Sequence, residues 1–218
     1  MALIRSVFQE ELDGVSQSLV DLATMVTQSM NKATQALLTA DLSVSEEVIS
    51  ADEKIDNYQH ELDSRIIDII ARQQPVASDL RALITALRMS ADLERMGDLS
   101  HHIAKVARLR HPESAVPQEQ QETIKKMGAV AVMISEKIGS VIETRNTLMA
   151  LELEKDDDEM DALHRSLITS LTDGTFSHGI ASAIDLTLLG RYYERFADHA
   201  VSVSRRVYFL VTGEFAPA

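Results

Sequence analysis

The chain has no cysteine and no tryptophan, and it has little proline or glycine. Without cysteine it forms no disulfide and no thiolate metal site, which agrees with a reducing, cytoplasmic location. Aromatic residues make up 4% of the sequence, so the core must be aliphatic. With 8 glycines and 4 prolines in 218 residues, turns are scarce and the elements between them are long.

Basic residues are few compared with acidic ones. There are 21 lysines and arginines against 34 aspartates and glutamates, which gives a formal net charge of −13 at pH 7. The negative electrostatic field of such a protein repels the phosphate backbone of nucleic acids, so we expect no nucleic-acid partner. Long hydrophobic runs are absent too: charges bound the stretch 66–71, which predicts no membrane insertion. In the N-terminal stretch MALIRSVFQEEL, acidic residues come before the apolar region that a secretion signal needs, so we expect no secretion signal.

What the sequence does have is helical periodicity. Apolar residues over 8–37 recur at steps of three and four, which predicts a core-facing helix that ends near Asp41. Ser43 and Glu46 have the spacing of a capping box that opens a second helix, and Pro75 ends it. A third helix is expected over about 77–109.

After a proline-containing stretch the same pattern starts again. Helices are expected from about residue 119, from about 147, and over about 177–211 with Gly213 as the C-cap. The simplest account is an internal repeat. The sequence therefore predicts an all-α protein of two pseudo-symmetric antiparallel three-helix bundles. We place the first repeat at 1–110, a linker at 111–118 and the second repeat at 119–218.

Paired acidic residues recur in both halves. Each pair is one helical turn apart, and the second-half pairs follow the first-half pairs by 105 and by 100 residues. The first-half pairs are Asp52 with Asp56 and Glu94 with Asp98; their counterparts are Asp157 with Asp161 and Glu194 with Asp198.

On the third helix, the pair Glu94 and Asp98 continues a three- and four-residue spacing of apolar residues. That spacing predicts a buried face made of Leu80, Ile84, Leu87 and Ala91. Two carboxylates in such a position repel each other and are costly to desolvate, so something must compensate for them.

Three compensations remain open at this point: a bound cation, arginines, or a proton shared within the pair. Four carboxylates from two helices suit a hard or borderline cation such as Mg, Ca, Mn, Fe or Zn. The arginines in the same stretches would satisfy the same acids without a metal. His101 and His102 follow on the same helix, and His102 is the additional candidate ligand. We find no catalytic motif, such as a glycine-rich phosphate loop or a nucleophile elbow, so no enzyme is predicted.

Beyond these patterns, the chain resembles a known family. The stretches QPVASDLRALITALRMSADLERMGD, GRYYERFADHAVSVSRRVYFLVTGE and ADEKIDNYQHELD resemble motifs of the PhoU family, the accessory regulators of bacterial phosphate-specific transport systems. The likeness covers nearly the whole chain, with both repeats in order.

The resemblance implies a non-enzymatic, cytoplasmic and commonly dimeric regulator. Such a protein acts with the phosphate ABC transporter and a sensor histidine kinase to keep the phosphate-starvation response off when phosphate is plentiful. It also implies that the two acidic sets hold divalent or trivalent metal ions. The alternative from the residues alone is a ferritin-like di-iron oxidase or iron-storage protein, although the Glu-x-x-His pairs typical of that class are missing.

Overall fold

The computed structural model describes residues 2–217, and the side chains of residues 8–217. Residues 1 and 218, which bound the two predicted repeats, lie outside the described part. Six long α-helices form the chain: α1 (Ala2–Thr39), α2 (Leu42–Gln73), α3 (Ala77–Arg110), α4 (Gln121–Thr144), α5 (Thr147–Thr172) and α6 (Gly179–Thr212), with a short 3₁₀ helix at Gln118–Gln120 before α4. The all-α prediction is confirmed.

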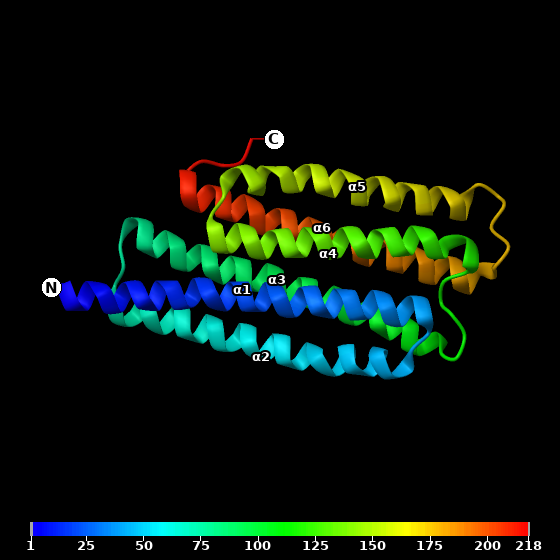
Figure 1. The fold of residues 1–218 in the computed structure, drawn as a ribbon, viewed down its shortest axis with the longest axis horizontal. Coiled ribbons are helices and arrows are strands. Elements are labelled where there is room, and N and C mark those ends of the chain that lie inside the picture. Colours follow the sequence, from blue (N-terminus) through cyan, green and yellow to red (C-terminus); the bar gives the residue numbers. More distant parts are fainter. Residues whose placement is uncertain (1, 218) are drawn as a thin grey trace.

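The six helices form two antiparallel three-helix bundles. The helices α1 and α4 lie side by side in one layer, with α3 and α6 behind them, and α2 and α5 flank the two sides (Figure 1). Within each pair of counterparts the two helices run in opposite directions (Figure 1), as a pseudo-twofold relation requires. One cluster of buried apolar side chains runs through both halves, so the repeats share a core.

The periodic residues of α1 lie in the shared core, and α1 packs against α4 of the other half. Leu22, Val26, Met30 and Leu37 are fully buried, as the spacing predicts. Thr34 lies among them, and its hydroxyl is 2.8 Å from the hydroxyl of Tyr193 on α6, which is itself fully buried. This hydrogen bond joins the first helix of the chain to the last.

Turn residues end the helices where the sequence predicts. The helix α2 stops two residues before Pro75, and Gly213 caps α6 with a left-handed φ of 78°, a conformation that glycine adopts without strain. The stretch between the repeats is packed rather than free, because Ala115 and Val116 are 5% and 1% exposed. The predicted repeat boundaries remain predictions. Within residues 2–217, no helix is both long and apolar enough to cross a membrane.

Two details of the predicted helices are wrong. Asp41, not Ser43, is the N-cap of α2: its carboxylate accepts a hydrogen bond from the backbone N–H of Val44 at 3.0 Å. Asp41 comes first along the chain and has the stronger acceptor, so it starts the helix two residues earlier.

The predicted buried face of α3 is also wrong. Ile84 is 40% exposed and Leu80 is 37% exposed, whereas Leu83, Leu93 and Met96 are fully buried. The helix is rotated so that small residues such as Gly97 meet its neighbours. Glu94 and Asp98 therefore lie at the edge of the core and not within it.

Candidate functional site

A close approach of α2 and α3 positions the first set of acids. A Cβ atom added to Gly97 of α3 would lie 3.0 Å from the Ile55 side chain of α2, so the two helices nearly touch at this point. The acids flank the contact on both helices. We call them the first acidic cluster: Asp52 and Asp56 of α2, and Glu94 and Asp98 of α3.

The carboxylates of the first acidic cluster oppose one another's ionisation. Burial raises the pKa of Asp52, and the charges of Asp56 and Asp98 raise it further against the opposing effect of His101. Burial also raises the pKa of Glu94, and the charge of Asp98 adds to that shift. A cation among these groups would reverse both effects.

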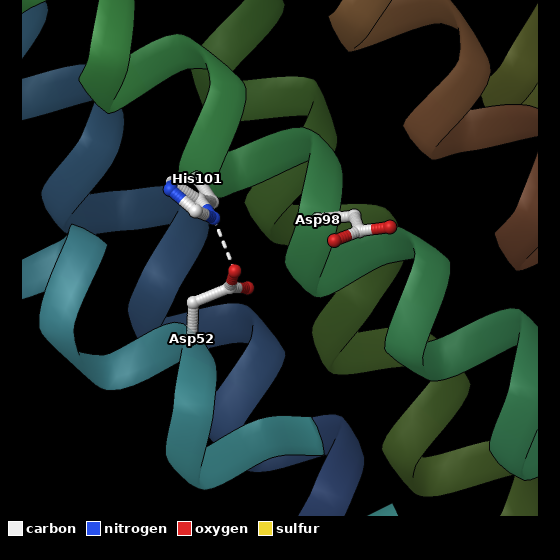
Figure 2. Close-up of side chains that lie close together, drawn as sticks. All are labelled: Asp52, Asp98 and His101. Atoms are coloured by element: carbon white, nitrogen blue, oxygen red, sulfur yellow. Dashed lines mark hydrogen bonds and ion pairs between the residues drawn. The ribbon is translucent and has the colours of Figure 1, made fainter.

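His101 completes the inner part of this cluster. Figure 2 shows its ring turned toward Asp52 across the gap between α2 and α3, where its Nδ1 donates a hydrogen bond to the Asp52 carboxylate. Asp52, Asp98 and His101 each offer one ligand atom, and these atoms all lie within 4.8 Å of one another. Nδ1 lies on the side of the ring that faces the acids, and its hydrogen bond to Asp52 fixes the orientation of the ring.

Several inner atoms of the first acidic cluster lack a partner. Asp52 Oδ1, Asp56 Oδ1 and His101 Nε2 are buried and make no hydrogen bond to any residue that the structure describes. Buried polar atoms are nearly always paired, so the two unpaired carboxylate oxygens indicate a group that binds beside them.

The second repeat brings four acids of α5 and α6 close enough to influence one another's charge, with no histidine at the position that matches His101. We call them the second acidic cluster: Asp157, Asp161, Glu194 and Asp198. Burial raises the pKa of Asp157 to about 6, with further contributions from Asp198, Asp161 and Glu194. Burial and the charge of Asp198 raise the pKa of Glu194. Asp157 Oδ1 and Glu194 Oε2 are again buried without a partner in the described part of the chain.

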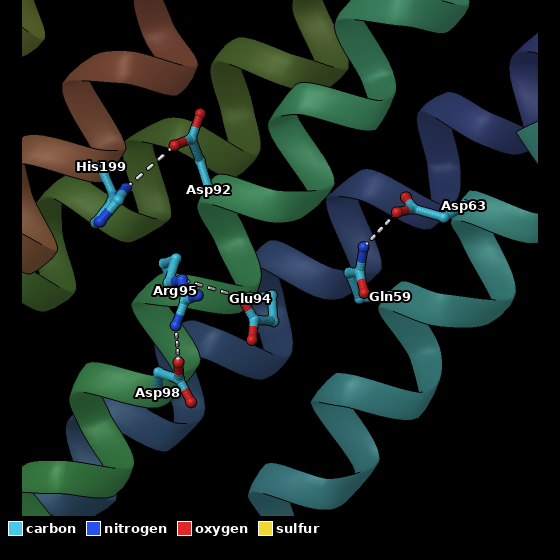
Figure 3. Close-up of polar contacts among 7 residues, drawn as sticks. All are labelled: Gln59, Asp63, Asp92, Glu94, Arg95, Asp98 and His199. Carbon is cyan, nitrogen blue, oxygen red and sulfur yellow. Dashed lines mark hydrogen bonds and ion pairs between the residues drawn. The ribbon is translucent and has the colours of Figure 1, made fainter.

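Arginines satisfy the outer oxygens of both clusters. Arg95 lies 2.7 Å from Asp98 and 3.7 Å from Glu94 (Figure 3), and Arg191 pairs with Glu194. About half or more of each arginine side chain is exposed, and ion pairs in that environment contribute little to stability. The arginine network anticipated from the sequence is therefore present, but it does not reach the inner oxygens.

The structure thus gathers all eight predicted acids into two clusters, four in each repeat. His102, the additional candidate ligand, lies outside the inner group: its ring stacks on Tyr192 with centroids 5.3 Å apart, and burial lowers its pKa. His101 takes part instead. Both histidines follow Asp98 by about one turn, and the sequence pattern does not distinguish them.

Comparisons with known proteins agree with this architecture. The PhoU domain family matches residues 19–107 and 124–207. The chain is 44% identical to the phosphate-specific transport system accessory protein PhoU homolog 2 of Mycobacterium tuberculosis, over 97% of this chain and 100% of that protein. It is 43% identical to the PhoU homolog 1 of Mycobacterium leprae, over 97% of this chain and 96% of that protein.

Solved structures give the same result. The crystal structure of the phosphate transport system regulatory protein PhoU from Streptococcus pneumoniae superposes with a TM-score of 0.85 at 25% identity, covering 97% of this chain and 100% of that one. The crystal structure of PhoU from Pseudomonas aeruginosa also gives a TM-score of 0.85, at 26% identity, and covers 95% of this chain and 100% of that one. The matches span both repeats and every helix that carries an acidic cluster.

Proposed function

Because this chain belongs to the PhoU family, we propose that it represses the phosphate-starvation response when phosphate is plentiful. It does so as a non-enzymatic, cytoplasmic homodimer that acts with the phosphate ABC transporter and a sensor histidine kinase. The proposal is supported by relatives named as accessory proteins of phosphate-specific transport, which match almost the full length of the chain.

Binding of metal ions by the two acidic clusters is the second part of the proposal. The observation that carries it is a buried, unpaired carboxylate oxygen at one equivalent position in each repeat, on Asp52 and on Asp157. Carboxylate oxygens suit Mg, Ca, Mn, Fe or Zn, and the imidazole of His101 favours Fe or Zn in the first repeat. A bound ion would supply the positive charge that these carboxylates lack. It would also fix α2 against α3 and α5 against α6.

Elemental analysis tests the metal sites. Protein purified without chelator is expected to carry ions, and Asp98→Ala and Asp198→Ala are each expected to lose those of one repeat. Addition of Mn²⁺ should raise the melting temperature of the chelator-treated protein by mass action. Asp68→Ala, an exposed acid outside both clusters, is the matched control. Metal-free native protein with an unchanged melting temperature would leave only the arginine network.

A genetic experiment tests the regulatory role. Deletion of the gene is expected to switch on phosphate-scavenging genes in high phosphate, and the wild-type gene should restore repression. Measurement of those transcripts decides the question, because unchanged expression after deletion contradicts the proposal whatever the metal content.

A further inference from the structure

The outward faces of α3 and α6 carry a pattern that helices normally direct toward a partner helix. Exposed side chains on α3 recur at steps of three and four residues, and those on α6 do the same. On α3 they are Arg81, Ile84, Arg88, Ala91 and Arg95; on α6 they are Ile184, Leu188, Arg191, Arg195 and Asp198, and the exposed Arg205 follows seven residues later. The spacing that predicted a buried face on α3 therefore does line up one face of the helix, but no described part of the chain covers that face.

Exposed apolar side chains concentrate on these two helices. In the described part of the chain there are twelve large ones, and eight of them lie on α3, on α6 or just beyond α6. Ile84, Ile184 and Leu188 are 40%, 54% and 41% exposed. Apolar side chains gathered on one face indicate an interaction surface, whereas scattered ones do not.

Two cavities follow the crossing of α3 and α6. One, of about 350 Å³, is lined by Ile84, Phe209 and Phe215 with arginines around them. The other, of about 530 Å³, lies nearer the middle of both helices and is lined by Arg95 and Arg195 among others. The two helices therefore form the sides of a groove of the kind into which a third helix packs.

Arginines gather on this surface, although three of them, Arg95, Arg191 and Arg205, already form ion pairs with acids of the chain. The chain has a net charge of −13, yet the outward positions of α3 and α6 include six arginines. Arg88 and Arg195 form no ion pair with any described residue, and Arg81 lies 5.5 Å from the ring centroid of Phe209. Guanidinium groups beside apolar side chains complement a helix with carboxylates beside apolar side chains.

We propose that the α3/α6 face is a docking surface for an acidic, amphipathic helix of a partner protein. The apolar side of that helix fills the groove, and its flanking carboxylates pair with the arginines. A second copy of this chain fits less well, because the acidic segment ELEKDDDEMD already buries its Leu153 and Met160 in its own core.

Fluorescence anisotropy with two labelled peptides tests the proposal. Each is a helical peptide of about 20 residues, roughly 30 Å long, with leucine at heptad spacing; one carries flanking glutamates and the other carries lysines instead. The glutamate peptide is expected to bind at least about tenfold more tightly than the lysine peptide, and less tightly as salt rises.

Surface variants identify the face. Ile84→Ser combined with Leu188→Ser, and separately Arg88→Glu combined with Arg195→Glu, should each weaken binding of the glutamate peptide by about tenfold or more. Ile67→Ser combined with Leu148→Ser, which are exposed apolar positions on α2 and α5, is the matched control and should change binding less than about twofold. Circular dichroism verifies that each variant is folded.

Cross-linking in cells identifies the natural occupant. A photo-cross-linker in place of Ile84 is expected to capture a protein segment that is acidic and has apolar residues at helical spacing, and one in place of Ile67 is not. Equal binding of both peptides, or capture at Ile84 of this chain or of lipid, overturns the proposal. Neither result affects the metal analysis or the transcript measurement, so a failure here is separate from a failure of the regulatory role.

Discussion

At the scale of single residues, Asp157 shows that the acidic clusters lower the folding stability of the metal-free protein at neutral pH. Its pKa is raised from 3.8 to about 6 by burial and by the charges of Asp198, Asp161 and Glu194. The folded chain therefore binds this proton more tightly than the unfolded chain does. The resulting stabilisation is complete below the unfolded pKa and is lost as the pH rises through about 6.

Replacement of Asp157 by asparagine should accordingly stabilise the chelator-treated protein at neutral pH. We expect Asp157→Asn to raise the free energy of unfolding by about 1 kcal/mol at pH 7, because solvent screens part of the effect at this half-exposed side chain. The gain should disappear toward pH 4. Urea denaturation at both pH values measures it, with Glu143→Gln, an exposed acid outside both clusters, as the control. An equal gain at both pH values would show that repulsion is not the cause.

At the scale of elements, two glycines of α4 have opposite environments. A Cβ atom at Gly128 would lie 2.3 Å from Cγ2 of Thr34 on α1, and the hydrogen bond to Tyr193 holds that threonine in place. A Cβ atom at Gly139 would meet nothing within 4 Å. The packing of α1 on α4 therefore depends on the first glycine and not on the second.

Alanine at these two positions should shift stability in opposite directions. Gly128→Ala is expected to lower the free energy of unfolding by about 1–3 kcal/mol through overpacking. Gly139→Ala is expected to raise it by about 0.5–1 kcal/mol, because alanine favours the helix. Thermal unfolding of the two variants side by side tests both expectations. Similar effects would mean that α1 and α4 are not in close contact at Gly128.

Most of the fold could be predicted from turn residues and periodicity, because few residues interrupt long helices. Helix rotation was the exception. On α3, two sets of apolar residues follow the same spacing, one through Leu83 and Leu93 and one through Ile84 and Ala91. Hydrophobicity alone cannot choose between them. The positions of small residues determine which face of α3 is buried, since Gly97 allows the close approach of Ile55 from α2.

At the scale of the whole molecule, Asp92 joins the two repeats. Its carboxylate accepts hydrogen bonds from His199 Nδ1 at 3.1 Å and from Arg206 Nε at 2.8 Å, both on α6 (Figure 3 shows the first). Burial by itself would raise the pKa of Asp92, but these two partners outweigh burial and hold the pKa below its ordinary value. The stabilisation is present above the unfolded pKa of 3.8 and is lost as the pH falls through the lower folded value.

Loss of this charge should weaken the contact between the repeats. Asp92→Asn is expected to lower the free energy of unfolding by about 1–3 kcal/mol at pH 7, since it leaves His199 and Arg206 with a weaker acceptor. The difference from wild type should shrink below pH 4. Chemical denaturation across this pH range measures it, with the exposed Glu61→Gln as a control. A deficit that does not change with pH would assign the effect to packing.

The site could be predicted only as far as spacing allows. Repetition identified all eight acids, because matched pairs in two halves seldom arise by chance; whether they bind ions stays a prediction. His101 was not preferred over His102, since only its contact with Asp52 on another helix separates them. That contact depends on how α3 is rotated against α2, which the periodicity left undecided.

The imidazole of His101 has no equivalent in the second half, where Val201 occupies the matching position. Under the proposed metal binding, the two halves then saturate at different concentrations of the same ion. A chain whose two metal sites differ in affinity responds over a broader range of ion concentration than a chain with two identical sites. Its empty, half-filled and full forms would be three distinguishable signals.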